Sequence, residues 1–257
     1  MNRGLLFVVV AVSIVSSTLI PVRASDDGRA IVEEAQKRST SQSERYEGLL
    51  QSFNSGHKTG EKRWVFERMG SHGESKSVIR FTAPSEVKGV ALLIVNHPER
   101  PSDQWMWTPA LERDRRIALQ DRSTRFFGTD FSFEDLEERD VDQYDHTLLG
   151  EETIDDAVTW KIQSIPKPAQ SSQYTKTIAW IRKENYATAR IDSYVIARVV
   201  RRLEFSDIRE VQGIWTAHDT LMTDLQRGSA TRLTLDKVQF NLPLKDDEFT
   251  VQALRRQ

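Results

Sequence analysis

The sequence predicts a mainly β protein built from one large, curved antiparallel sheet or barrel. Apolar and polar residues alternate over short runs such as Val158–Gln163 and Val199–Ser206, which is the pattern of half-buried strands. Short polar, glycine-containing segments of hairpin length separate such runs, for example Gly70–Gly73 and Gln226–Ser229. Apolar repeats with helical spacing are rare after Lys62. Many short strands joined by hairpins therefore define the predicted fold class.

One helical segment is expected before these strands. Asp26 or Asp27 can cap its start, and the apolar residues Ile31 and Ala35 stand four positions apart. The polar run Ser39–Ser43 interrupts the pattern, so the segment forms a single helix or a helix broken in two.

The strands then follow one another between turn-forming residues. In the run Arg232–Asn241 the alternation changes parity at Asp236 and Lys237, which predicts a β-bulge that restores one apolar face. The segment Pro166–Ser172 has strand-like sequence on both sides, so it is interpreted as a long hairpin loop, and residues 25–257 as a single domain. Further strands are expected at Lys62–Arg68, Ser77–Phe81, Val90–Val95, Asp103–Trp107, Lys176–Arg182, Thr188–Val195 and Ile214–Asp224.

The first residues have the pattern of a secretory signal peptide. The stretch Leu5–Ile20 is nearly all apolar, and the small-x-small sequence Val22-Arg23-Ala24 follows it. A membrane anchor is the alternative, but this stretch is short for a span of about 20 residues. We therefore expect cleavage after Ala24 and export to the periplasm, with residues 1–24 removed.

Composition and motifs argue against several classes of function. Cysteine is absent, so disulfides, thiolate metal sites and cysteine nucleophiles are excluded. The net charge of −2 is mixed in sign along the chain, which gives no footprint for nucleic acid. The five histidines are scattered, and the chain has neither a G-x-S-x-G motif nor a P-loop. We expect a protein that is not an enzyme and that has no metal site and no cofactor; an unrecognised hydrolase is the weakest alternative.

Aromatic residues supply the unusual chemistry of the chain. Trp105 and Trp107 stand two apart and therefore share one face of a strand. The segment Phe126–Leu136 contains four phenylalanines but is broken by Gly128, and a capping-type Ser132 follows. It is interpreted as a loop leading into a short helix, which forms a lid or rim over an apolar hollow and moves when cargo enters. Packing in an ordinary core is the alternative.

Five strings follow one another along the chain: Ile79–Pro84, Lys88–Leu93, Asp103–Leu111, Arg115–Ile117 and Phe127–Leu136. Together they resemble the outer-membrane lipoprotein-sorting protein family, the LolA-like periplasmic proteins. The resemblance is close between about residues 60 and 140, and looser at Leu242–Leu244 and Asp247–Thr250. It implies an incomplete, strongly curved antiparallel β-barrel of about eleven strands, with covering helices around an apolar hollow.

The resemblance also implies a function. The family's fold suggests a periplasmic carrier that binds acyl chains of lipoproteins or lipids and transfers them toward the outer membrane. An inner-membrane exporter of the resistance–nodulation–division type is the implied partner, and contact with membranes is expected to be transient. The alternative is a non-enzymatic periplasmic adaptor that docks on a lipid exporter or an assembly machine.

The candidate site combines the aromatic residues with one polar contact. Arg115 and Arg116 are predicted to latch the loop through Asp130, with a weak surface ion pair as the alternative. The predicted ligand-binding residues are Trp64, Phe66, Phe81, Leu92, Trp105 and Trp107 in strands, and Phe126, Phe127, Phe131 and Phe133 in the loop.

Overall fold

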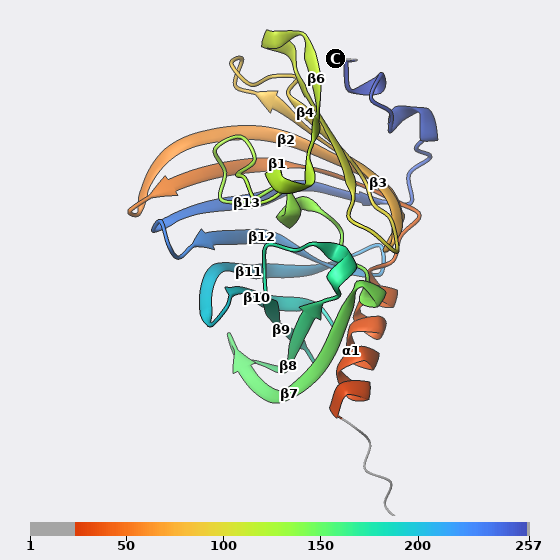
Figure 1. Cartoon of the computed structure of the whole chain (residues 1–257), viewed down its shortest axis with the longest axis vertical. Coiled ribbons are helices and arrows are strands. Elements are labelled where there is room, and N and C mark those ends of the chain that lie inside the picture. The colour runs from red at the N-terminus through yellow and green to blue at the C-terminus, as the bar shows by residue number, and fades with distance from the viewer. Residues whose placement is uncertain (1–23, 256–257) are drawn as a thin grey trace, which may run out of the picture.

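The computed structural model describes residues 24–255, in which one antiparallel sheet contains thirteen strands in the order β6-β5-β4-β3-β2-β1-β13-β12-β11-β10-β9-β8-β7 (Figure 1). The predicted signal peptide lies outside the described residues, except for Ala24. The elements are α1 (Ala24–Ser39), β1 (Ser43–Asn54), β2 (His57–Ser71), β3 (Glu74–Ala83), β4 (Ala91–Val95), β5 (Asp103–Thr108), β6 (Arg113–Ile117), β7 (Tyr144–Ile154), β8 (Ala157–Pro166), β9 (Lys176–Arg182), β10 (Thr188–Val195), β11 (Arg198–Val211), β12 (Ile214–Asp224) and β13 (Ser229–Phe240).

The predicted fold class is confirmed. The sheet curls strongly but remains open, because within the described residues β6 and β7 are its two edges and do not pair with each other (Figure 1). The bounds predicted for β9, β10 and β12 agree with the structure. Strands β1, β6 and β7 were not predicted. Their sequences are rich in charged and polar residues, so they lack the apolar alternation that marks the other strands.

The predicted bulge lies in β13. Glu47 of β1 pairs with Lys237, while the next residue, Gly48, pairs with Leu235, so Asp236 is the extra residue. A Cβ atom on Gly48 would stand 2.0 Å from the carbonyl oxygen of Thr234. Glycine is therefore required opposite the bulge, where the two backbones approach closely.

Replacing Gly48 by alanine should lower the free energy of unfolding by about 1–3 kcal/mol, because backbone atoms would have to move. Gly60→Ala in β2 is the matched control, since a Cβ there meets no atom within 4 Å. We expect that control to change the free energy of unfolding by no more than about 0.5 kcal/mol. Denaturant unfolding of both variants measures the difference. Equal stabilities would contradict the close approach.

The helix α1 is continuous and ends at Ser39, where the predicted interruption begins. It packs against β7 through Gly28, where a Cβ atom would lie only 2.6 Å from the backbone nitrogen of Leu148. The helix therefore covers the open side of the sheet next to its β7 edge (Figure 1). No helix among the described residues has the length and apolar character needed to cross a membrane.

Apolar side chains gather on both faces of the β1–β6 half of the sheet. On the concave face, Trp64, Phe81 and Leu92 belong to a buried cluster. On the convex face, the C-terminal segment, residues 242–255, packs Phe249 and Leu254 against β3, β4 and β5 (Figure 1). This half of the sheet is thus covered on two sides, whereas the β7–β12 half faces the helix.

Candidate ligand-binding hollow

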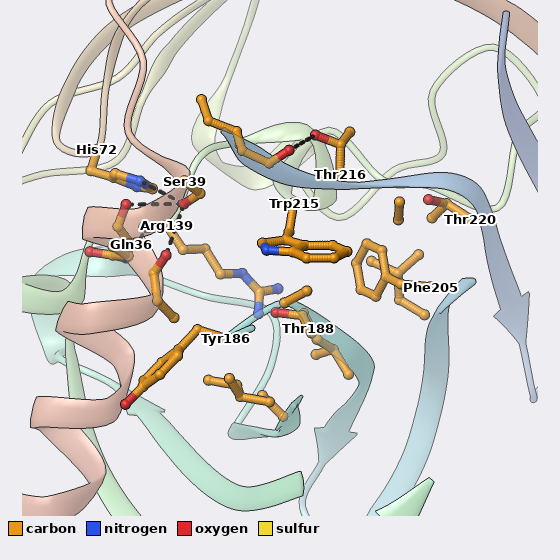
Figure 2. A pocket seen from close by; sticks show the side chains of 18 of the residues that line it. Gln36, Ser39, His72, Arg139, Tyr186, Thr188, Phe205, Trp215, Thr216 and Thr220 are labelled. Atoms are coloured by element: carbon orange, nitrogen blue, oxygen red, sulfur yellow. Dashed lines mark hydrogen bonds between the residues drawn. The ribbon is translucent and has the colours of Figure 1, made fainter. Parts of the chain in front are cut away.

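A hollow of about 890 Å³ lies between α1 and the concave face of the sheet (Figure 2). This volume is within the range of roughly 300–1,000 Å³ that is typical of small-molecule sites. Because side chains alternate along a strand, the inward-facing residues of several strands form much of the wall. The apolar lining includes Val32 and Ala35 of α1 and Tyr46, Trp64, Phe66, Ile79, Ala179, Ile181, Ile191, Leu203, Phe205, Ile208, Ile214, Trp215, Ala217, Leu233 and Leu235 of the sheet.

One end of the hollow is polar. The Glu44 carboxylate accepts hydrogen bonds from Tyr46 Oη at 2.7 Å and from Arg68 Nη2 at 3.1 Å. Arg68 also pairs with Glu138. His72 Nε2 lies 3.4 Å from Ser39 Oγ of α1 (Figure 2). Burial raises the pKa of the Glu44 carboxyl, and the Arg68 charge offsets this only in part. The network ties the C-terminal end of α1 to the sheet.

The segment between β6 and β7 fills the rest of the concave side. We call residues 124–136 the aromatic plug. Phe126 stacks on Phe81 of β3 with ring centroids 5.4 Å apart, and Phe133 contacts Phe126 edge-on at 5.8 Å. Phe126 and Phe133 are each only 3% exposed. The plug therefore completes the core over β2, β3 and β4 and forms one boundary of the hollow, whose wall still includes Trp64 and Phe66 of β2.

Asp130 anchors the plug to β13. Its carboxylate is 1% exposed and accepts hydrogen bonds from Thr231 Oγ1 at 2.8 Å and Ser229 Oγ at 2.5 Å, and it pairs with Arg125. The amide nitrogen of Asp130 also donates to Thr231 Oγ1 at 2.8 Å. A buried carboxylate needs such compensation, because an unpaired charge away from water is very unfavourable.

Two more carboxylates hold the end of the plug and the residue that follows it. Asp135 accepts from Tyr174 Oη at 2.8 Å and pairs with Arg201 of β11 at 2.5 Å. Glu137 accepts two hydrogen bonds from the buried Arg122, at 2.6 and 2.5 Å. Burial raises the pKa of the Glu137 carboxyl, and Arg122 offsets this only in part. The expected capping contact is present as well, since Asp135 Oδ2 accepts from the Ser132 amide at 2.7 Å.

The predicted site residues separate into three groups. Trp64, Phe66 and Phe131 line the hollow. Phe81 and Leu92 face the same side of the sheet but are covered by the plug, to which Phe126, Phe127 and Phe133 belong. The roles of all these residues in binding stay a prediction.

Trp105 and Trp107 form the third group, and they do not line the hollow. They pair directly with Leu93 and Ala91 of β4, and directly opposed residues point to the same face of a sheet. That face is the convex one, where both indoles pack with Phe249 in the cluster under the C-terminal segment. Their placement in the wall of the hollow was wrong, because β4 is apolar on both faces and does not reveal which one is concave.

The predicted latch between Asp130 and Arg115 or Arg116 is also wrong. Asp130 pairs with Arg125. Arg116 instead donates to Asp103 at 2.5 Å, on the edge of the sheet. Hydrogen bonds from Arg100 first, and also from Arg116 and His97, hold the pKa of Asp103 well below its usual range. Arg115 and Arg116 are exposed on β6, the edge strand of the sheet, and neither pairs with Asp130.

Much of the wall was missed by sequence reasoning, above all the residues from β9 to β12. Leu203 and Phe205 lie on the apolar side of an alternating run, which is a signal for burial but does not distinguish a core from a cavity. Arg139 was missed as well. It follows the plug, and its guanidinium extends toward Trp215 and Thr188 (Figure 2).

The class of protein follows from this arrangement: an open antiparallel half-barrel around an apolar hollow, as in LolA-like proteins. A crystal structure described as an outer-membrane lipoprotein-sorting protein domain from Vibrio parahaemolyticus matches with a TM-score of 0.85 and 25% identity, over 90% of this chain and 100% of that one. A DUF1329 family protein from Desulfovibrio piger matches with a TM-score of 0.85 and 26% identity, over 91% and 100%. The fold also matches a LolA superfamily protein from Nitrosomonas europaea, with a TM-score of 0.69 and 19% identity over 88% and 98%.

These likenesses confirm the resemblance to the outer-membrane lipoprotein-sorting family. A family model described as uncharacterized protein matches residues 73–256, and the chain belongs to that family. No curated protein sequence matches the chain.

Phe133→Ala should lower the free energy of unfolding by about 3–5 kcal/mol, because it leaves a cavity in the buried cluster that the plug forms with β2, β3 and β4. Phe127→Ala is the matched control: Phe127 is half-buried, so a smaller loss is expected. Denaturant unfolding gives both values. A mobile lid predicts the opposite result, namely little loss of stability and a large change in affinity for an acyl-chain probe.

His146 provides a test by pH. Burial lowers the pKa of its imidazole, which lies 2.9 Å from Ser164 Oγ and 3.1 Å from the Val141 carbonyl. Below about pH 6.5 the unfolded chain takes up a proton that the folded protein resists, so this contribution to stability is lost as the pH falls. Between about pH 7.5 and 5.5, the wild type should therefore lose more stability than His146→Gln.

The exposed His57 at the start of β2 supplies the control for that series. His57→Gln should keep the pH dependence of the wild type in urea unfolding. The same dependence in all three proteins would show that the buried imidazole does not contribute.

Proposed function

We propose that this protein is a periplasmic carrier that holds acyl chains of lipids or lipoproteins in the hollow and transfers them toward the outer membrane. The main support is that the hollow is not filled by the protein's own side chains: about 890 Å³ remains beside an apolar wall. An adaptor that only docks on other proteins has no need for such a space. The description of the Vibrio parahaemolyticus relative as a lipoprotein-sorting protein domain agrees with this proposal.

The physical chemistry of the wall suits this cargo. Each methylene group removed from water contributes about 0.8 kcal/mol, whatever the exact shape of the chain. Aliphatic and aromatic side chains such as Ile191, Leu203 and Phe205 supply contacts without directed polar groups. A site of this kind tolerates different chains and releases them reversibly, as transfer between membranes requires.

Export and partners complete the proposal. The predicted removal of residues 1–24 would deliver the chain to the periplasm, and residues 25–257 would act as one carrier domain. An inner-membrane exporter as donor stays a prediction.

Ala217→Phe in β12 should weaken binding of a fluorescent fatty-acid probe at least tenfold, because the larger side chain occupies the hollow that Ala217 lines. Ala230→Phe is the matched control, since Ala230 lies on the neighbouring strand β13 and follows the alternation to the other face. It should bind the probe as the wild type does.

Probe titration and thermal unfolding should be recorded for all three proteins, so that a loss of affinity is separated from a loss of folding. If the wild type binds no acyl-chain probe, the carrier function is wrong and the adaptor is favoured. If Ala217→Phe binds normally, the ligand lies outside this hollow.

A further inference from the structure

One charged side chain in the hollow lacks a partner. Arg139 follows the plug, and its backbone carbonyl accepts a hydrogen bond from Gln36 of α1 at 2.8 Å. Its guanidinium extends into the hollow among Trp215, Tyr186 and Thr188 (Figure 2). With the described residues, this guanidinium makes neither a hydrogen bond nor an ion pair; its cationic group lies 6.0 Å from the centre of the Tyr144 ring.

Other arginines around the plug are paired, which makes Arg139 distinctive. Arg122 binds Glu137, Arg201 binds Asp135, and Arg68 binds Glu44 and Glu138. These three side chains are at most 11% exposed. Their pairing follows the general rule that charges removed from water are compensated by opposite charges.

The surroundings of Arg139 keep it charged but leave its donors free. Burial lowers the pKa of this guanidinium, but nearby acidic groups raise it by more, so that the pKa lies above its usual value. These groups are Tyr144, Asp135, Tyr174 and Glu134. The two carboxylates are already engaged: Asp135 with Arg201 and Tyr174, and Glu134 with the Gln173 amide at 2.9 Å and with Ser172. The N–H groups of Arg139 are therefore available to a ligand.

The position of Arg139 fits the head of an amphiphile. The residue also lines a smaller cavity of about 160 Å³, which shares Asp135, Ile191 and Leu203 with the main hollow. The other residues that line it are Glu137, which is paired with Arg122, and Ser193, Arg201 and Met222. From this junction the apolar wall of the main hollow continues along β11 from Leu203 to Phe205. A chain along the wall would place its polar end at this junction.

We propose that Arg139 is an anion-binding residue, which pairs with the phosphate or carboxylate head of an acyl-chain amphiphile held in the hollow. A guanidinium donates two parallel hydrogen bonds to either group, and these bonds are strong where water is excluded. The inference rests on the proposed carrier function and names the chemical class of its cargo: anionic single-chain amphiphiles, in preference to neutral or cationic ones.

The test compares ligands that share a palmitoyl or hexadecyl chain and differ in the head. Palmitate carries a carboxylate, palmitoyl-lysophosphatidylglycerol a phosphate, monopalmitoylglycerol no charge, and hexadecyltrimethylammonium a positive charge. Each displaces a neutral fluorescent acyl probe from the wild type, at alkaline pH and low salt. At least one anionic ligand should bind about tenfold or more tightly than the neutral one, which corresponds to about 1.4 kcal/mol. Whether the carboxylate or the phosphate gains identifies the head.

Three variants complete the experiment. The Arg139→Gln variant should bind the anionic ligands only as tightly as the neutral ligand, and its affinity for the neutral ligand should equal that of the wild type. The Arg139→Lys variant should keep part of the preference for anionic ligands. Arg227→Gln is the control, because Arg227 is exposed on the β12–β13 hairpin. Equal affinities of the wild type for anionic and neutral ligands, or an unchanged preference in Arg139→Gln, would overturn the anion site alone. No binding of any ligand would overturn the carrier function together with it. The wild-type comparison remains decisive if a variant fails to fold.

Discussion

The open edge of the sheet is the constraint on which the rest of the structure depends. A curved sheet that does not close leaves its concave face exposed, and apolar side chains on that face must be covered. Two separate segments cover it: the aromatic plug over β2, β3 and β4, and α1 near β7. Because the two covers do not meet over the whole face, a hollow remains between them.

The plug holds its place through paired charges as well as through aromatic packing. Asp130 binds Thr231 of β13 and Asp135 binds Arg201 of β11, so the plug is attached to two distant strands. Glu137 binds Arg122, which joins the two ends of the plug segment. Breaking one such buried pair leaves an uncompensated charge, which costs more than the pair itself contributes. The plug therefore forms one boundary of the hollow and provides the position from which Arg139 extends.

The hollow combines two kinds of recognition. Its apolar wall gains free energy from any chain that it shields from water, and so discriminates little between chains. A free guanidinium inside the same space would discriminate by charge. A neutral or cationic ligand would leave the guanidinium without an opposite charge, whereas an anionic ligand would supply one. Low selectivity for the chain and higher selectivity for the head suit a carrier that meets many lipids and transfers one class of them.

The sequence by itself determined the fold class, the ends of several strands, the bulge at Asp236 and the loop character of the plug. These features depend on local patterns: period-two alternation, a change of parity, and a break at Gly128 followed by the capping contact between Ser132 and Asp135. The resemblance added the half-barrel around a hollow. Only the tertiary structure decided which face of each strand is concave.

Trp105 and Trp107 lie on the convex face. The sequence could not show this, because β4 is apolar on both sides and the pattern of a strand does not distinguish two buried faces. The tertiary structure also decided which charges meet. Asp130 and Thr231 stand far apart along the chain and lie together only after the plug folds over β13. The free guanidinium of Arg139 could not be foreseen for the same reason: whether a charge has a partner depends on every element that packs around it.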